Sequence, residues 1–304
     1  MGDERAAGNA IRVVPGQPPE LVVHDYPSNC PYLPDRPARM PLRLPARSLR
    51  ADELDMRLAA GDRRQGVVLY RTECPDCTAC IPLRIDVPNF VPSRTHRRIL
   101  RRGDRTLKIE IGPPTLDDRR VALYNRHKLQ RGLGDENGLI DRDGYLAFLV
   151  ETCCDSFEMR FFRESELVGV AIVDRGNSSL SAMYCYYEPD LKSLSIGTYA
   201  ILKQLEICRH RNMRFLYLGL YVEGSPTMAY KARFYPHQQR HDGRWTQVRK
   251  PETKAARNSA LGARTCQGKV EMSGSRYVAG HVGPGPDHEQ TRVRARSFAE
   301  LSPG

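Results

Sequence analysis

The sequence has no apolar run long enough to span a membrane, and its longest apolar segments have the length of single strands. The segment after Met1 is polar and charged and lacks the apolar core of a secretory signal peptide. The nine cysteines, an odd number with three bunched together, do not resemble the disulfide framework of a secreted protein. These absences argue against a membrane-spanning or secreted protein, and we expect a cytoplasmic one.

Lysine is scarce, and the formal net charge of +11 comes mainly from arginine. A strongly basic protein favours an anionic partner, usually nucleic acid, because neutralising phosphates releases condensed counterions. Arginine suits phosphate since its planar fork donates two parallel hydrogen bonds. A GC-rich genome would also favour arginine codons, so only the distribution of the arginines can indicate function.

The sequence also lacks an internal repeat and a convincing Ser-His-Asp triad. Its 304 residues can form one large domain or two modest ones. Polar composition rich in Gly and Pro predicts disorder in residues 1–20 and a disordered tail over 250–304. Between them we expect a Cys- and Arg-rich N-terminal domain over 21–105 and a mixed α/β domain over 106–249.

Four cysteines stand out by their spacing. Cys74, Cys77 and Cys80 follow one another as C-x2-C-x2-C, and Cys30 lies upstream. Thiolates at this spacing can reach one metal, so the four would suit a zinc ion or an iron–sulfur cluster. The alternative is ordinary reduced cysteines or a redox pair. Strand-like pieces flank the thiol loop, and a crosslink would stabilise a block whose apolar core is thin.

The second block alternates strand and helix. The apolar runs 157–163 and 167–174 predict a hairpin, and 179–187 predict a third strand. An amphipathic helix begins at Gly197, and a strand follows from residue 215. This order is that of the acyl-CoA N-acyltransferase (GNAT) core, so we predict an α/β (α+β) fold with a GNAT-like catalytic domain. Order alone is weak evidence, because many α/β domains share it.

Seven short motifs occur in order over about residues 25–246. They are Cys30-Pro-Tyr-Leu-Pro, Arg63-Arg-Gln-Gly-Val-Val-Leu-Tyr-Arg71, Cys74-x2-Cys77-x2-Cys80-Ile-Pro-Leu-Arg84, Phe90-Val-Pro-Ser-Arg-Thr-His-Arg-Arg98, Ser195-Ile-Gly197, Tyr217-Leu-Gly219 and Met228-Ala-Tyr-Lys-Ala-Arg-Phe-Tyr-Pro236. As a set they resemble the bacterial aminoacyl-tRNA–protein transferases, which include the aspartate/glutamate leucyltransferases and are related to eukaryotic arginyltransferases.

The resemblance implies transfer of an amino acid from aminoacyl-tRNA to the N-terminal amine of proteins beginning with Asp or Glu, which marks them for degradation. Leucine is favoured over arginine as the donor. Leu220, Tyr221 and Ser225 depart from the family pattern near the expected donor pocket, so the donor stays open. The ester is already activated, so neither ATP nor CoA is needed. We expect a monomer.

A tRNA surface is predicted where arginines cluster. A helix over 93–102 would place four arginines on one face at i, i+3, i+4 and i+7 spacing, with Ile99 and Leu100 pointing away. The alternative is a solvated basic stretch without function. The predicted tRNA-binding residues are Arg94, Arg97, Arg98 and Arg101, with Arg63, Arg64 and Arg71 as weaker candidates.

The acidic side chain of the acceptor protein calls for a cation. Lys231 and Arg233 alternate with apolar neighbours beyond the last core strand, and Tyr230 stands beside them. Partial desolvation there would favour recognition of a carboxylate. The alternative is that both cations pair with local carboxylates or with tRNA phosphate.

A proton acceptor and support for the oxyanion are also required. Tyr184 and Tyr186 lie two residues apart on one face of the predicted strand, and Glu223 follows the next core strand. We predict catalytic roles for these three, the alternative for the tyrosines being half-buried core residues. Ser195 to Thr198 precede a helix and would offer amide donors to the tRNA end.

Two other functions remain open from the residues. An N-acetyltransferase using acetyl-CoA fits the element order, but the Gly-x-Gly pyrophosphate pattern is absent and the thiols are unexplained. A zinc-knuckle RNA-binding module explains the charge and the thiols, but not the α/β block. Retention of bound tRNA would exclude the first, and turnover would exclude the second.

Overall fold

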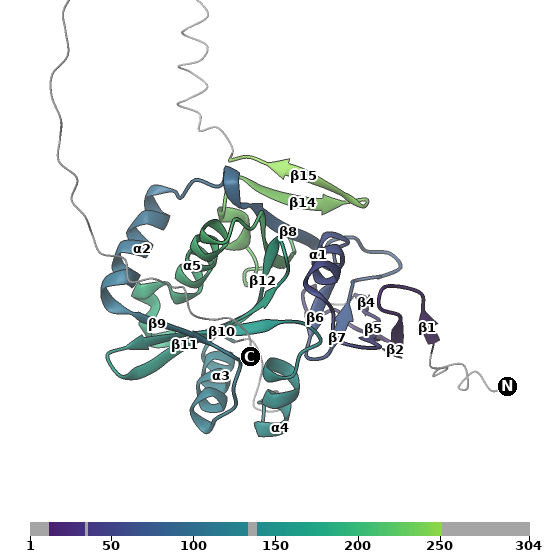
Figure 1. Cartoon of the computed structure of the whole chain (residues 1–304), viewed down its shortest axis with the longest axis horizontal. Helices are drawn as coiled ribbons and strands as arrows, with labels where there is room; N and C mark the ends of the chain where they lie inside the picture. Colours follow the sequence, from purple (N-terminus) through teal and green to yellow (C-terminus); the bar gives the residue numbers. More distant parts are fainter. Residues whose placement is uncertain (1–11, 34–35, 133–138, 251–304) are drawn as a thin grey trace, which may run out of the picture. The chain divides into compact units, whose positions relative to one another are not determined.

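Eight strands form the central sheet of the structure, a computed structural model that describes residues 12–33, 36–132 and 139–250 (Figure 1). Neighbouring strands pair antiparallel except β12 and β13, which run parallel. In spatial order the strands are β15 (Arg244–Val248), β14 (His237–His241), β8 (Ile81–Asp86), β13 (Phe215–Tyr221), β12 (Ser179–Tyr187), β11 (Glu166–Arg175), β10 (Ser156–Arg163) and β9 (Lys108–Gly112).

Helices cover both faces of this sheet, with α2 and α5 on one side and α3 and α4 on the other (Figure 1). The α-helices are α1 (Ala51–Ala59), α2 (Arg94–Thr106), α3 (Asp118–Gln130), α4 (Arg142–Tyr145) and α5 (Ile196–His210). Shorter helical segments are the 3-10 helices η1 (Val87–Asn89), η4 (Pro189–Leu194) and η5 (Lys231–Arg233) and the π-helical segment η3 (Leu146–Val150).

The middle strand β11 shows why the sheet needs both helical layers. Val170 and Ile172 join the core under α3 and α4. Their neighbours Ala171 and Val173 join the core under α2 and α5. A strand buried on both faces has a nearly continuous apolar sequence, as β11 does.

The N-terminal part forms a smaller sheet beside α1. Its strands, in spatial order, are β1 (Arg12–Val14), β2 (Glu20–His24), β5 (Leu42–Pro45), β7 (Val68–Tyr70) and β6 (Arg63–Gln65), and a separate hairpin pairs β3 (Pro27–Asn29) with β4 (Pro37–Arg39). Leu54 and Leu58 of α1 share an apolar cluster with Leu69 and with Tyr217 of β13. The two sheets are thus joined by apolar packing.

The predicted order of the second block is confirmed: β10 and β11 form the hairpin, β12 the third strand, α5 the helix and β13 the strand after it. The mixed α/β class is therefore correct. The predicted division at residue 105 does not coincide with a break in the sheet, since β8 precedes it and lies between β13 and β14. Separate folding of the two blocks stays a prediction.

Disorder predicted for residues 1–20 is wrong for 12–20. Backbone pairing of β1 with β2, with Arg12 opposite Val22, orders this segment, and composition does not reveal such pairing. The tail predicted from residue 250 lies, after Lys250, outside the described residues. Within the described ranges, no helix combines the length and apolar character needed to cross a membrane.

Candidate functional site

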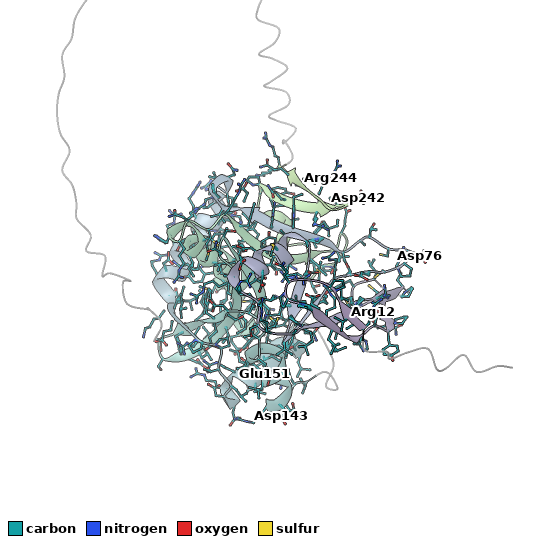
Figure 2. All side chains as sticks on the ribbon, turned by 45° about the vertical axis from the view of Figure 1, so that its right-hand side comes forward. Arg12, Asp76, Asp143, Glu151, Asp242 and Arg244 are labelled. Carbon is teal, nitrogen blue, oxygen red and sulfur yellow. The ribbon has the colours of Figure 1, made fainter. Side chains whose placement is uncertain are left out.

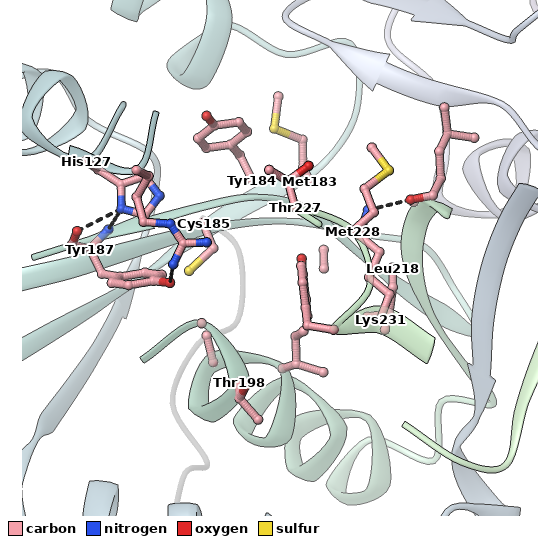
Figure 3. Close-up of a pocket in the computed structure, with 18 of the residues that line it drawn as sticks. His127, Met183, Tyr184, Cys185, Tyr187, Thr198, Leu218, Thr227, Met228 and Lys231 are labelled. Atoms are coloured by element: carbon pink, nitrogen blue, oxygen red, sulfur yellow. Dashed lines mark hydrogen bonds between the residues drawn. The ribbon is translucent and has the colours of Figure 1, made fainter. Parts of the chain in front are cut away.

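A cavity of about 750 Å³ lies where β12 and β13 separate. The two parallel strands pair only up to Ser181 and Tyr217, although both continue beyond these residues. Residues that follow the paired stretch, among them Ala182 and Leu218, line the cavity. The parting of two strands in mid-sheet therefore creates the opening, and Figure 3 shows the side chains around it.

The first turn of α5 borders the cavity. Ser195 has a left-handed φ of 52°, the helix begins at Ile196, and Ser195, Gly197 and Thr198 line the cavity. The first amides of a helix have no intrahelical acceptor, so this end favours negative charge. Gly197 also makes room for the ring of Tyr187, since a Cβ at this position would lie 3.1 Å from it. The predicted helix start is confirmed.

Lys231 lines the cavity, as predicted, together with Tyr230 and Arg233. The Lys231 Nζ donates a hydrogen bond of 2.6 Å to the carbonyl oxygen of Leu220. Burial, together with the positive charge of Arg63, lowers the pKa of Lys231 to about 7. Lys231 can therefore gain or lose a proton near neutral pH. Arg233 also lines the cavity, and its side chain is exposed.

Arg63 and Arg64 are neighbours on β6 and point to opposite faces. Arg64 is buried and donates two hydrogen bonds, of 2.9 and 2.7 Å, to one carboxylate oxygen of Asp174. No phosphate can reach a guanidinium held in this way, so the prediction that Arg64 binds tRNA is wrong. Arg63 instead turns into the cavity and contacts Ser181 and Ala182 of β12.

Gly219 allows Arg63 to take this position. An added Cβ at Gly219 would lie 2.9 Å from the guanidinium, and its φ of +83° is one that glycine adopts readily. The predicted role of Arg63 in tRNA binding presumed a surface side chain. Its exposed fraction is 8%, so Arg63 belongs to the cavity and not to an outer tRNA surface.

The two predicted catalytic tyrosines differ in their burial. Tyr184 is half-buried and lines the cavity (Figure 3). Tyr186 is fully buried, and its hydroxyl lies 2.5 Å from that of Tyr145 on α4. Burial raises the pKa of both Tyr184 and Tyr186. The predicted place of Tyr186 in the cleft is wrong, because α3 and α4 cover this stretch of β12.

Glu223 follows β13, as the sequence indicated, but its side chain is exposed and does not line the cavity. The structure does not bring Glu223 together with Lys231 and Tyr184. A catalytic role for Glu223 stays a prediction without support from this geometry.

Sequence reasoning missed His127 and Arg131 of the α3 region, which line the cavity. Figure 3 shows His127 beside Tyr187. The His127 Nδ1 lies 2.9 Å from the carbonyl oxygen and 3.2 Å from the amide nitrogen of Tyr187, so it contacts both backbone groups of that residue. Burial lowers the pKa of His127 to about 4, which keeps the ring neutral. Arg131 donates to the Tyr187 hydroxyl at 2.9 Å. Their i, i+4 spacing was the available signal, because it places two side chains on one face of a helix.

The arginine helix is confirmed as α2. Ser93 caps it by accepting a hydrogen bond of 3.1 Å from the His96 amide, and Ile99 is buried as expected. The side chains of the predicted tRNA-binding residues Arg94, Arg97, Arg98 and Arg101 are exposed. Among the described residues, no carboxylate forms an ion pair with these four arginines. They lie outside the cavity, on a helix that packs against α5.

The four predicted ligand thiols lie between and beside short strands. Cys30 follows β3, and the amide of Arg39, at the end of β4, lies 3.5 Å from the Cys74 sulfur. Burial and the neighbouring thiols of Cys30, Cys74 and Cys77 raise the pKa of Cys80 to about 11. Asp76, within this loop, lies at the edge of the molecule in Figure 2.

The neighbouring thiols thus affect the pKa of Cys80. Four soft sulfur donors of this kind suit zinc or an iron–sulfur cluster. In the described parts of the chain, however, no three His, Cys, Asp or Glu side chains are arranged as a metal site. Metal binding stays a prediction, and no chemical step depends on it. Tyr32, two residues after Cys30, lines the cavity and links the thiol region to it.

The sequence matches two family descriptions, "Arginine-tRNA-protein transferase, N terminus" over residues 28–98 and "Arginine-tRNA-protein transferase, C terminus" over residues 119–241. The aspartate/glutamate leucyltransferase of Thiobacillus denitrificans is 36% identical over 237 residues, which cover 76% of this chain and 97% of that protein. The chain belongs to the arginine-tRNA-protein transferase family. The family expected from the motifs is confirmed, and this arginine-tRNA-protein transferase family member is an aminoacyltransferase.

A second relative carries the same name. The aspartate/glutamate leucyltransferase of Gluconobacter oxydans is 37% identical over 231 residues, covering 75% of this chain and 95% of that protein. Solved structures are less similar. FemX has a TM-score of 0.43 at 9% identity, covering 75% of this chain and 74% of FemX. The C-terminal domain of a putative lysylphosphatidylglycerol synthetase from Agrobacterium fabrum has a TM-score of 0.42 at 15% identity, covering 62% and 64%. The family assignment depends on the sequence relatives alone.

Proposed function

We propose that the protein transfers leucine from leucyl-tRNA to the N-terminal amine of proteins that begin with Asp or Glu, which marks these proteins for degradation. The observation that carries the proposal is the similarity to aspartate/glutamate leucyltransferases along nearly their whole length. The cations in the cavity add support, because they suit an acidic acceptor. Arginine is the alternative donor.

The reaction joins an amine to an activated ester, without ATP or CoA. The acceptor nitrogen attacks the ester carbonyl carbon, a C–N bond forms, and the C–O bond to the tRNA ribose breaks. The amine loses one proton and the departing ribose oxygen gains one. Holding the two reactants together in the right orientation can lower the activation barrier by about 7–11 kcal/mol. Orientation in a cavity can therefore supply much of the catalysis.

Lys231 is the group best suited to receive the proton of the amine. It lines the cavity, and its pKa of about 7 leaves a large neutral fraction at physiological pH. Tyr184 lines the same cavity, and its hydroxyl stays protonated because burial raises its pKa. A protonated hydroxyl can donate to the oxyanion of the tetrahedral intermediate. These roles replace the proton acceptor first sought in Glu223.

The tRNA is proposed to bind along α2. Its exposed arginines lie on a helix that packs against α5, and the first turn of α5 borders the cavity. The tRNA phosphates would bind α2, and the aminoacylated end of the tRNA would enter the cavity beside the neighbouring helix α5. Arginine forks suit the phosphates, and the amide end of α5 suits their negative charge.

The finer fold assignment is a GNAT-like catalytic domain. The chain order β10, β11, β12, α5, β13 and the parting of parallel strands at the cavity support it. We further propose a cytoplasmic monomer whose partners are aminoacyl-tRNA and proteins with N-terminal Asp or Glu, without a membrane. A zinc ion or an iron–sulfur cluster at Cys30, Cys74, Cys77 and Cys80 would have a structural role.

The test is transfer of radiolabelled leucine, and separately arginine, from charged tRNA to peptides that begin with Asp, Glu or Ala. We expect leucine on the Asp and Glu peptides and not on the Ala peptide. Arginine on the same peptides would correct the donor. Absence of both labels, with tRNA still bound, would overturn the proposed function.

A further inference from the structure

Arg63 is a buried cation that lacks an acidic partner in the described part of the chain. Its exposed fraction is 8%, yet no described carboxylate lies within ion-pair distance of its guanidinium. Burying a charge without a counter-charge is costly, so such residues normally pair or bind a ligand. Arg63 faces a cavity large enough to admit one.

Arg64 provides the comparison within the same strand. It has nearly the same burial as Arg63, and Asp174 neutralises it at 2.7 Å, with both side chains 1% exposed. The fold therefore supplies a carboxylate to Arg64, which also borders the cavity. It supplies none from the described residues to Arg63, whose guanidinium turns toward β12.

The contacts of Arg63 leave part of its donor set free for a ligand. One amino group donates to the Ser181 hydroxyl at 3.1 Å, and the other donates to the Ala182 carbonyl at 3.3 Å. A guanidinium has five N–H donors, so three are not used by these two bonds. Both anchors come from β12, and they hold the guanidinium against Gly219 of β13. The group is thus fixed where the strands part.

The other cations of the cavity are less suited to hold a carboxylate. The Lys231 ammonium is bound to the Leu220 carbonyl and loses its charge near neutral pH. Arg131 donates one hydrogen bond to the Tyr187 hydroxyl and is exposed. Lys192 and Arg233 are exposed as well, so water competes for the donors of all three. Arg63 combines permanent charge, low exposure and fixed geometry.

We propose that Arg63 binds the side-chain carboxylate of the N-terminal Asp or Glu of the acceptor protein, and so selects acidic acceptors. This inference rests on the proposed function of the same cavity. It moves selection from Lys231 and Arg233, where the sequence placed it, to a residue first considered for tRNA. Asp and Glu carry the same carboxylate, which a guanidinium fork binds through two parallel hydrogen bonds.

The experiment compares transfer to otherwise identical peptides that begin with Asp or with Asn, which differ only in the carboxylate. We expect the wild-type ratio of kcat/KM, Asp over Asn, to be at least about 30-fold. Arg63→Gln, which can still bond to Ser181, should bring the ratio close to one. Arg63→Lys, which keeps the charge, should retain an intermediate ratio. The ratio is taken within one preparation, so a partly unfolded sample does not alter it.

Two further measurements complete the design. Arg175→Gln changes an arginine outside the cavity and should leave the ratio and the tRNA affinity unchanged. Should Arg63→Gln fail to fold, the Asp peptide should still raise the Tm of the wild-type protein more than the Asn peptide does.

The outcomes are separable. No transfer by the wild-type protein would defeat the proposed function itself. Transfer with an unchanged Asp/Asn ratio in Arg63→Gln would overturn the role of Arg63 alone. Loss of the ratio in Arg233→Gln but not in Arg63→Gln would give the role to Arg233. A loss of tRNA affinity in Arg63→Gln that accounts for its whole defect would return Arg63 to tRNA binding.

Discussion

Arg63 lies against Gly219 and Lys231 binds the carbonyl of Leu220, so the two cations meet at consecutive residues of β13. Arg63 comes from the N-terminal sheet and Lys231 from the segment after the last core helix. Burial and this proximity lower the pKa of Lys231. One cation keeps its charge, and the other can act as a base.

The rate of transfer should rise with pH through the pKa of Lys231. The pKa is about 7, far below the usual value for lysine, so below it the amine is protonated and cannot accept a proton. Single-turnover rates measured between about pH 6 and 9 should show this inflection, and Lys231→Met should lose it, with kcat lower by about 10²–10⁴. The α-amine of the peptide titrates at about 7.7–8.0 and should remain as the only inflection in the variant. Identical profiles for both proteins would contradict a proton-accepting role.

The buried Arg64–Asp174 pair should stabilise the junction of the two sheets. Asp174→Asn leaves Arg64 buried without a counter-charge and should lower the free energy of unfolding by about 3–5 kcal/mol in urea titrations. The adjacent Arg175 forms a surface pair with Asp155 at 2.6 Å, with side chains 36% and 50% exposed. Asp155→Asn is the matched control and should cost no more than about 1 kcal/mol. Equal effects of the two substitutions would show that burial does not matter here.

The exposed face of α2 should carry part of the affinity for tRNA. Replacing Arg94, Arg98 and Arg101 by Gln should weaken binding and reduce the slope of log K against log salt by about one for each phosphate that the variant no longer neutralises. Filter binding at several salt concentrations measures both effects. Arg126→Gln on α3, an exposed arginine paired with Glu188, is the control. An unchanged slope in the triple variant would place the tRNA elsewhere.

The thiol cluster should support the fold and not the chemistry. Cys77→Ser is expected to lower Tm and activity together, because Tyr32, two residues after Cys30, lines the cavity. Metal analysis of the purified protein, with thiol titration before and after chelation, tests whether the four thiols hold an ion. Full stability with lost activity would contradict a structural role, and full retention of both would make the cluster dispensable.

Local sequence was sufficient to predict a helix or strand where a residue pattern repeats within that element. The spacing of arginines and apolar residues predicted α2 and its exposed face, because the helical period alone decides which side chains lie together. The order β10, β11, β12, α5, β13 was readable for the same reason, since runs and breaks of apolar residues mark each element. The family motifs identified the type of enzyme before any geometry was known.

Local patterns determined neither the orientation nor the surroundings of single side chains. Alternation along β6 shows that Arg63 and Arg64 point apart, but only the packing of β6 near β11 and β12 decides which one meets Asp174 and which one faces the cavity. Tyr184 and Tyr186 likewise lie on one face of β12. Only the packing of α4, whose Tyr145 contacts the Tyr186 hydroxyl, shows that Tyr186 is the buried one. Burial, charge pairing and pKa depend on segments distant in the chain. Patterns along the chain therefore predict the elements and the class of reaction, whereas contacts between distant segments fix which side chains can take part in it.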